Sequence, residues 1–258
     1  MWHHERAVSP SRSVPPSRAR PLPGVVRARR LPIAATVVVA ALLLATGGTA
    51  WADGYWVVTA DGQVVAFGDA VDHGQLHPDR LPAPIADIAA RADGAGTWLL
   101  DRDGVVFVLG AAGFVGSPAV LGLGGVVALA PTPGGGGYWV TGPDGGVFAY
   151  GDAGFFGSTG DIRLNQPVVG MAPTPSGRGY WLVATDGGVF AFGDAGFFGS
   201  TGDIPLNEPI VGISPTSSGQ GYWLVASDGG VFAFGDAGFV GSAVGRVTTP
   251  VVALAPAP

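Results

Sequence analysis

Short apolar runs, separated by turns rich in glycine and polar residues, recur along most of this chain. In one example, residues 180–184 are followed by Asp186-Gly187 and then by a second apolar run at residues 189–192. Two such runs joined by Asp-Gly predict a pair of antiparallel strands with a tight hairpin turn. Because both runs are apolar at successive positions, we expect both faces of these strands to be covered by other parts of the protein.

The pattern occurs five times, and each copy contains a tryptophan that is followed five positions later by Asp-Gly. The tryptophans are separated by 42, 41, 42 and 42 residues, and the units begin at residues 54, 96, 137, 179 and 221. They are Trp56, Trp98, Trp139, Trp181 and Trp223. A repeat of about 42 residues made of short strands is typical of the blades of a β-propeller. The expected fold is therefore all-β, as a five-bladed propeller.

Each blade is expected to contain four strands. Around Trp181 these are strand A at residues 168–173, strand B at 180–184, strand C at 189–192 and a short outer strand D at 197–200. The first B strand, at Gly54, has no A strand before it in the repeat, and the last A strand, at Val251, has no B strand after it. The simplest closure pairs residues 251–255 with the first B strand, which leaves no exposed sheet edge. The alternative is an open set of repeats that pairs with another chain.

The first 52 residues do not follow the repeat. Residues 1–30 are rich in arginine, proline and serine, as in a disordered basic segment. Residues 31–52 contain an apolar stretch that ends in Ala50-Trp51-Ala52, and this combination predicts a secretory signal peptide cleaved after Ala52. The mature protein would then be residues 53–258, secreted or attached to the cell envelope. The alternative is an uncleaved signal that anchors the protein in the membrane.

Charge and composition exclude several functions. Seven of the 13 basic residues and one of the 19 acidic residues lie in the first 30 positions, so the rest of the chain has a net charge of 6 − 18 = −12. Such an acidic domain repels phosphate backbones, and we therefore expect no nucleic-acid partner. The absence of cysteine excludes disulfides, thiol nucleophiles and thiolate metal sites. No motif indicates a cofactor.

Two resemblances follow from the repeat. The string that begins Gly179-Tyr180-Trp181 and ends at Gly199 differs from residues 221–241 at two of 21 positions. It resembles glycine- and aromatic-rich repeats of exported proteins from high-GC Gram-positive bacteria, which are often fused to cell-wall or protease domains. The resemblance covers residues 54–258 and implies export without specifying an activity. In blade number and size the chain also resembles five-bladed tachylectin-type lectins, by architecture alone.

Most of the polar residues in the repeat are expected to have structural roles. The aspartates of the two glycine turns in each unit are best explained as turn formers whose carboxylates accept backbone N–H groups. Calcium would need about six to eight converging oxygen atoms, so we predict no metal site. His73 and His77 could form a metal site or a catalytic pair, but no surrounding motif supports catalysis. We therefore predict no catalytic residues.

The segments that connect strand D to the next strand A are the best candidates for binding. They are longer than a hairpin needs, and an antiparallel blade places them on the same face as the Asp-Gly turns. Their amides, carboxylates and hydroxyls suit neutral polyols or a cationic partner. The tyrosine before four of the five key tryptophans could add a rim for stacking. The candidate ligand-binding residues are Asp161, Asn165, Gln166, Asp203, Asn207, Glu208, Tyr138, Tyr180 and Tyr222.

These observations predict an exported, non-enzymatic binding module. The expected partner is a cell-wall or surface glycan, or an extracellular protein, and contact with a membrane is expected only through an uncleaved signal. Two alternatives belong to other classes. One is an exported hydrolase or lyase with its site in the central funnel, which acidic residues of raised pKa would indicate. The other is a structural spacer or envelope protein.

Overall fold

In the computed structural model, residues 37–40, 55–67, 70–122, 125–246 and 250–251 are described. The chain divides into the units Met1–Ala34 and Ala35–Pro258, and all the described residues belong to the second. The predicted basic segment and most of the predicted signal peptide lie outside the described residues. Within the described part, no helix is long and apolar enough to cross a membrane.

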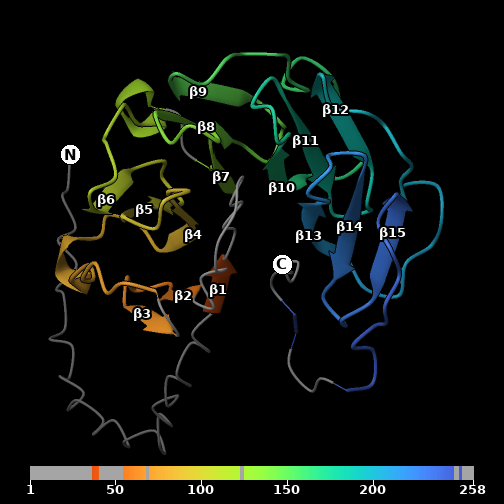
Figure 1. The fold of residues 1–258 in the computed structure, drawn as a ribbon, viewed down its shortest axis with the longest axis horizontal. Helices are drawn as coiled ribbons and strands as arrows, with labels where there is room; N and C mark the ends of the chain where they lie inside the picture. The colour runs from red at the N-terminus through yellow and green to blue at the C-terminus, as the bar shows by residue number, and fades with distance from the viewer. Residues whose placement is uncertain (1–36, 41–54, 68–69, 123–124, 247–249, 252–258) are drawn as a thin grey trace, which may run out of the picture. The chain divides into compact units, whose positions relative to one another are not determined.

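The all-β prediction is confirmed. The described residues form five antiparallel sheets of three strands each, and Figure 1 shows them in chain order. The sheets are β1–β3 (Val37–Ala40, Tyr55–Thr59, Val64–Phe67), β4–β6 (Ile85–Ala90, Gly96–Asp101, Val106–Gly110), β7–β9 (Ala128–Pro131, Gly137–Thr141, Val147–Gly151), β10–β12 (Val168–Pro173, Gly179–Ala184, Val189–Gly193) and β13–β15 (Ile210–Pro215, Gly221–Ala226, Val231–Gly235). Two short 3-10 helices, η1 (Pro78–Arg80) and η2 (Pro118–Leu121), lie in the connecting segments.

The sheets share one register, which follows from the repeat. In the fourth sheet Trp181 lies opposite Ala172 on one side and Ala191 on the other. A tight turn follows the third strand, where Gly193 has a φ of +70° and a Cβ would lie 2.2 Å from the carbonyl oxygen of Arg178. A side chain does not fit there, which explains why Gly151 and Gly235 occupy the same position in the neighbouring units.

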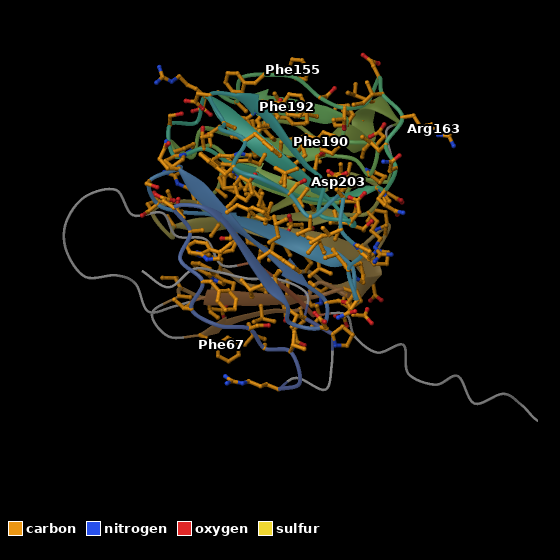
Figure 2. The ribbon with its side chains drawn as sticks, turned by 90° about the vertical axis from the view of Figure 1, so that its right-hand side faces the viewer. Phe67, Phe155, Arg163, Phe190, Phe192 and Asp203 are labelled. Atoms are coloured by element: carbon orange, nitrogen blue, oxygen red, sulfur yellow. The ribbon has the colours of Figure 1, made fainter. Side chains whose placement is uncertain are left out.

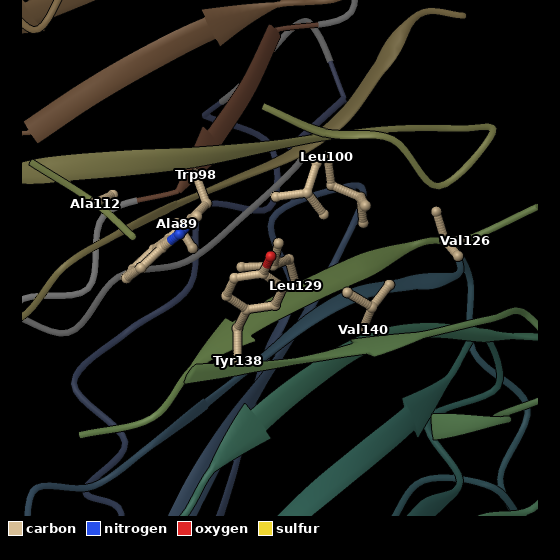
Figure 3. Close-up of a cluster of buried hydrophobic side chains, with 9 residues drawn as sticks. Ala89, Trp98, Leu100, Ala112, Val126, Leu129, Tyr138 and Val140 are labelled. Carbon is tan, nitrogen blue, oxygen red and sulfur yellow. The ribbon is translucent and has the colours of Figure 1, made fainter. Parts of the chain in front are cut away.

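The hydrophobic core lies between consecutive sheets. Four clusters of buried side chains are present, and each combines residues of two successive units. Figure 3 shows the cluster between the second and third sheets, where Trp98 from β5 faces Tyr138 from β8. Their rings are 5.6 Å apart in an edge-on arrangement, which is favourable for aromatic pairs. Both faces of these strands are therefore covered, as their apolar pattern predicts.

The prediction of a fourth strand in each unit is wrong in the described residues. Residues 197–200 pair with no strand, and the sheet ends at β12. We call the four-residue stretch that ends in glycine after each third strand the outer segment. In successive units it is residues 71–74, 113–116, 154–157, 196–199 and 238–241. Its backbone groups bind side chains instead of a strand: the carbonyl of Gly196 accepts the indole N–H of Trp181, and that of Gly199 accepts the Tyr222 hydroxyl.

The first sheet also differs from the expectation. Its inner strand is β1, from the predicted signal peptide, and Val37 lies opposite Thr59. The predicted partner, residues 251–255, falls outside the described residues except for Val251. The backbone N–H of Val251 donates to the Ser227 carbonyl at 2.7 Å, just as that of Ile210 donates to the Thr185 carbonyl at 2.8 Å. Val251 thus occupies the position at which an inner strand begins.

Candidate binding surface

The repeated Tyr-Trp pair holds the outer segments in place. Each key tryptophan donates its indole N–H to the carbonyl oxygen fifteen residues later, at 2.6–2.8 Å. The tyrosine reaches the outer segment of the preceding unit instead. The Tyr180 hydroxyl donates to the Gly157 carbonyl at 2.6 Å and accepts the backbone N–H of Phe156 at 3.2 Å. Tryptophan therefore fixes an outer segment to its own unit, and tyrosine joins it to the next.

This role places the predicted tyrosine rim in the core. Tyr138, Tyr180 and Tyr222 are each 0% exposed, and their hydroxyls are used within the fold. We therefore leave the three tyrosines out of the candidate surface. The sequence allowed this outcome, because a tyrosine in the middle of a doubly covered strand is more often packed than presented to a ligand.

The second unit has Thr97 where the others have tyrosine, and a histidine makes part of the missing connection. The Nε2 atom of His73 lies 2.9 Å from the Gly94 carbonyl oxygen. The His73 ring stacks on Trp56, and the ring centroids are 5.8 Å apart. Thr97 is buried, and its hydroxyl has no hydrogen-bond partner among the described residues. His73 thus packs and bonds as part of the fold. No group of three or more potential metal ligands occurs in the described ranges.

The aspartates act as turn formers where the structure gives their contacts. In the strand hairpins, Asp144, Asp186 and Asp228 accept the backbone N–H two residues later, at 2.8–2.9 Å. Asp194 instead binds the turn between the first two strands. Its carboxylate accepts the hydroxyl groups of Ser176 at 2.5 Å and Thr174 at 2.8 Å. These hydrogen bonds, together with the charge of Arg178, lower the pKa of the carboxyl. These carboxylates stabilise turns.

The connectors, residues 158–167 and 200–209, lie where the sequence predicts. A buried threonine anchors each one to an Asp-Gly turn: Thr159 donates its hydroxyl to the Asp144 carbonyl at 2.9 Å, and Thr201 donates to that of Asp186 at 3.1 Å. The connectors and the Asp-Gly turns therefore share one face. Figure 2 shows Arg163 at the margin of the fold.

The polar side chains of the connectors point to solvent. The six candidates other than the tyrosines are all exposed: Asp161, Asn165, Gln166, Asp203, Asn207 and Glu208. Two of them also reach back to the hairpin. Gln166 accepts the Thr185 hydroxyl at 3.4 Å, and Glu208 accepts the Ser227 hydroxyl at 3.2 Å. The two connectors thus present matched side chains, one set in each of two neighbouring units, on anchored loops.

Two carboxylates of raised pKa in the second unit, Asp87 and Asp101, were missed by the sequence analysis. Asp87 lies on β4, and burial raises the pKa of its carboxyl to about 7, although it accepts the backbone N–H groups of Leu129 and Ile88 at 2.8 Å each. Burial also raises the pKa of Asp101, which accepts N–H groups from its own turn. A comparison of the repeats could have singled out Asp87, because the equivalent positions in the next three units are Ala128, Gly170 and Gly212, none of which is charged.

Comparison with known proteins identifies no relative. No family model matches this chain, and no curated protein matches it.

Proposed function

We propose that this protein is an exported, non-enzymatic binding module that recognises a cell-surface glycan or an extracellular protein through its connectors. One observation carries the proposal: two neighbouring units present the same polar side chains on loops anchored in the same way. Asp161 and Asn165 in one connector match Asp203 and Asn207 in the next. Exposed polar groups held by a packed scaffold are typical of binding loops.

Repetition strengthens such a surface. Two equal sites on one rigid molecule bind a repeating or multivalent partner more tightly than either site alone. The acidic character of the chain after the basic segment favours uncharged or cationic partners and disfavours nucleic acid. These features suit a polyol-rich glycan or a basic protein surface.

The proposal includes a closed ring of five blades in the exported form. Removal of the signal peptide would also remove β1 and leave β2 without its inner neighbour. Residues 251–255 have the apolar sequence of an inner strand, and Val251 already occupies the starting position of one. Pairing of this segment with β2 would close the ring and give both β2 and the C-terminal segment a strand partner.

A hydrolase or lyase is the second candidate, because Asp87 and Asp101 have carboxyl groups of raised pKa. An acidic group that titrates near pH 7 is suited to general acid catalysis. Each carboxylate is, however, engaged by backbone N–H groups, and burial accounts for both shifts. The binding role is therefore the better explanation.

Replacing Asp161, Asn165, Asp203 and Asn207 together with alanine is expected to lower retention of the full chain on purified bacterial cell walls at least tenfold. The four side chains are exposed, so the variant should keep its melting temperature. A matched control replaces Arg178 and Gln220, which are exposed on turns at the opposite end of the strands, and should bind like the original protein. Equal retention of all three proteins would rule out the connectors as the site.

A further inference from the structure

Four phenylalanines occupy the same exposed position in successive units. They stand second in the outer segments, 41, 42 and 42 residues apart. Their exposed fractions fall between 60% and 63%, which is high for a side chain of this size. They are Phe114, Phe155, Phe197 and Phe239. Figure 2 shows Phe155 at the margin of the fold, whereas Phe192 lies farther in.

In the third and fourth units the fold uses the residue that follows the exposed ring, but not the ring itself. Phe156 and Phe198 turn inward and pack against the neighbouring tyrosines, with ring centroids 5.8 and 5.7 Å apart. The preceding residue must then face outward. In the first unit Asp72 occupies this outward position, so an aromatic side chain is not needed for folding. A single exposed apolar side chain needs no explanation, but here the same large ring is exposed at one position in four successive units.

The arrangement favours a particular kind of ligand. Each ring is on a separate unit and directly follows a glycine, which is Gly113, Gly154, Gly196 or Gly238. Protein interfaces and membrane-binding surfaces use contiguous apolar patches of several hundred Å². Rings presented one to a unit, at intervals of 41 or 42 residues along the sequence, instead suit a chain molecule that offers one small apolar face after another. Pyranose rings of an uncharged polysaccharide have such C–H faces, bordered by hydroxyl groups.

Charge supports the same choice. After the basic segment the chain has 18 acidic and six basic residues. An aspartate precedes three of the rings by three positions, and hydrogen bonds from Ser176 and Ser218 lower the pKa values of Asp194 and Asp236, which keeps them ionised. Anionic lipids, phosphate-rich polymers and acidic polysaccharides would be repelled. A second copy of this chain would bring together two acidic surfaces.

We propose that the outer-segment phenylalanines form a second binding surface, on which successive sugar rings of an uncharged β-linked polysaccharide stack. This inference rests on the proposed role as a binding module and adds a ligand class and a separate set of residues. Each ring contributes modestly, and the series supplies the affinity through simultaneous contacts.

The test measures depletion of the full chain from solution by insoluble cellulose and chitin, with anionic alginate beads as the comparison. Cellulose or chitin should bind the protein and alginate should not. Replacing Phe155, Phe197 and Phe239 with alanine should weaken binding at least tenfold, since each stacked ring is worth between about twofold and tenfold. Replacing the same three residues with tyrosine keeps the rings and should retain binding.

A matched control removes exposed apolar groups elsewhere. Val120→Ala with Leu121→Ala changes residues of η2 that are 79% and 62% exposed, and it should leave polysaccharide binding unchanged. Unaltered binding of the triple alanine variant would overturn the inference, as would equal binding to alginate or no binding to cellulose and chitin. The connectors are tested separately on cell walls, so loss there with no polysaccharide binding would leave the proposed function standing without this second surface.

Discussion

Tyr180→Phe is expected to destabilise the protein by about 2–4 kcal/mol, although it removes a single oxygen atom. That hydroxyl donates to the Gly157 carbonyl and accepts the Phe156 N–H, both in the outer segment of the preceding unit. The segment has no strand partner, so the substitution leaves two backbone groups unpaired in a region shielded by aromatic rings. Each unpaired group that remains away from water costs about 1–3 kcal/mol.

Tyr150→Phe is the matched control for this prediction. The Tyr150 hydroxyl is buried and has no hydrogen-bond partner among the described residues, and the next two units have Phe192 and Phe234 at this position. Removing it should leave stability unchanged or raise it slightly. Urea unfolding followed by tryptophan fluorescence would measure both variants. Equal effects of the two substitutions would show that the tyrosine hydroxyls do not join the units.

The second large effect concerns Asp87 and pH. Burial raises the pKa of its carboxyl from 3.8 to about 7, so the folded state binds a proton more tightly than the unfolded state between these values. The stabilisation from this group is complete below about pH 4 and is lost as pH rises through about 7. A difference of this size corresponds to a change in unfolding free energy of about 2–4 kcal/mol.

Asp87→Ala should remove that dependence. The difference in unfolding free energy between the original protein and the variant should shift by about 2–4 kcal/mol between pH 4 and pH 8, with the original protein relatively more stable at low pH. Urea unfolding at a series of pH values measures it. Asp194→Ala gives a contrast of opposite sign, because hydrogen bonds lower the pKa of that carboxyl and its stabilisation is lost at acidic pH. If the difference in unfolding free energy between Asp87→Ala and the original protein stays constant from pH 4 to pH 8, Asp87 does not cause the pH dependence.

The strands of the hairpins could be predicted because local signals determine them. Runs such as residues 180–184 and 189–192, joined by Asp186-Gly187, correspond to β11 and β12 within one residue. The position of the core was also predictable, since continuous apolar character requires cover on both faces. The connectors followed from their length and from the direction of antiparallel strands.

The outer segments could not be predicted in the same way. Phe197-Phe198 has the composition of a strand, yet its neighbouring carbonyls are taken by side chains of Trp181 and Tyr222, from two different units. Contacts of this kind depend on how sheets pack, which a local pattern does not show. Asp87 was missed for a similar reason, because its partner Leu129 lies 42 residues away on the next inner strand.

Closure of the ring is tested most directly by comparing residues 53–258 with residues 53–249. Both lack β1, so only the longer chain has a fifth inner-strand segment with which to complete the first sheet. The account predicts that residues 53–258 form a stable monomer with one cooperative unfolding transition, and that the shorter chain loses that transition. Light scattering and urea unfolding measure both. Equal stability of the two chains, or association of the longer chain into multimers, would contradict a ring closed by its own C-terminal strand.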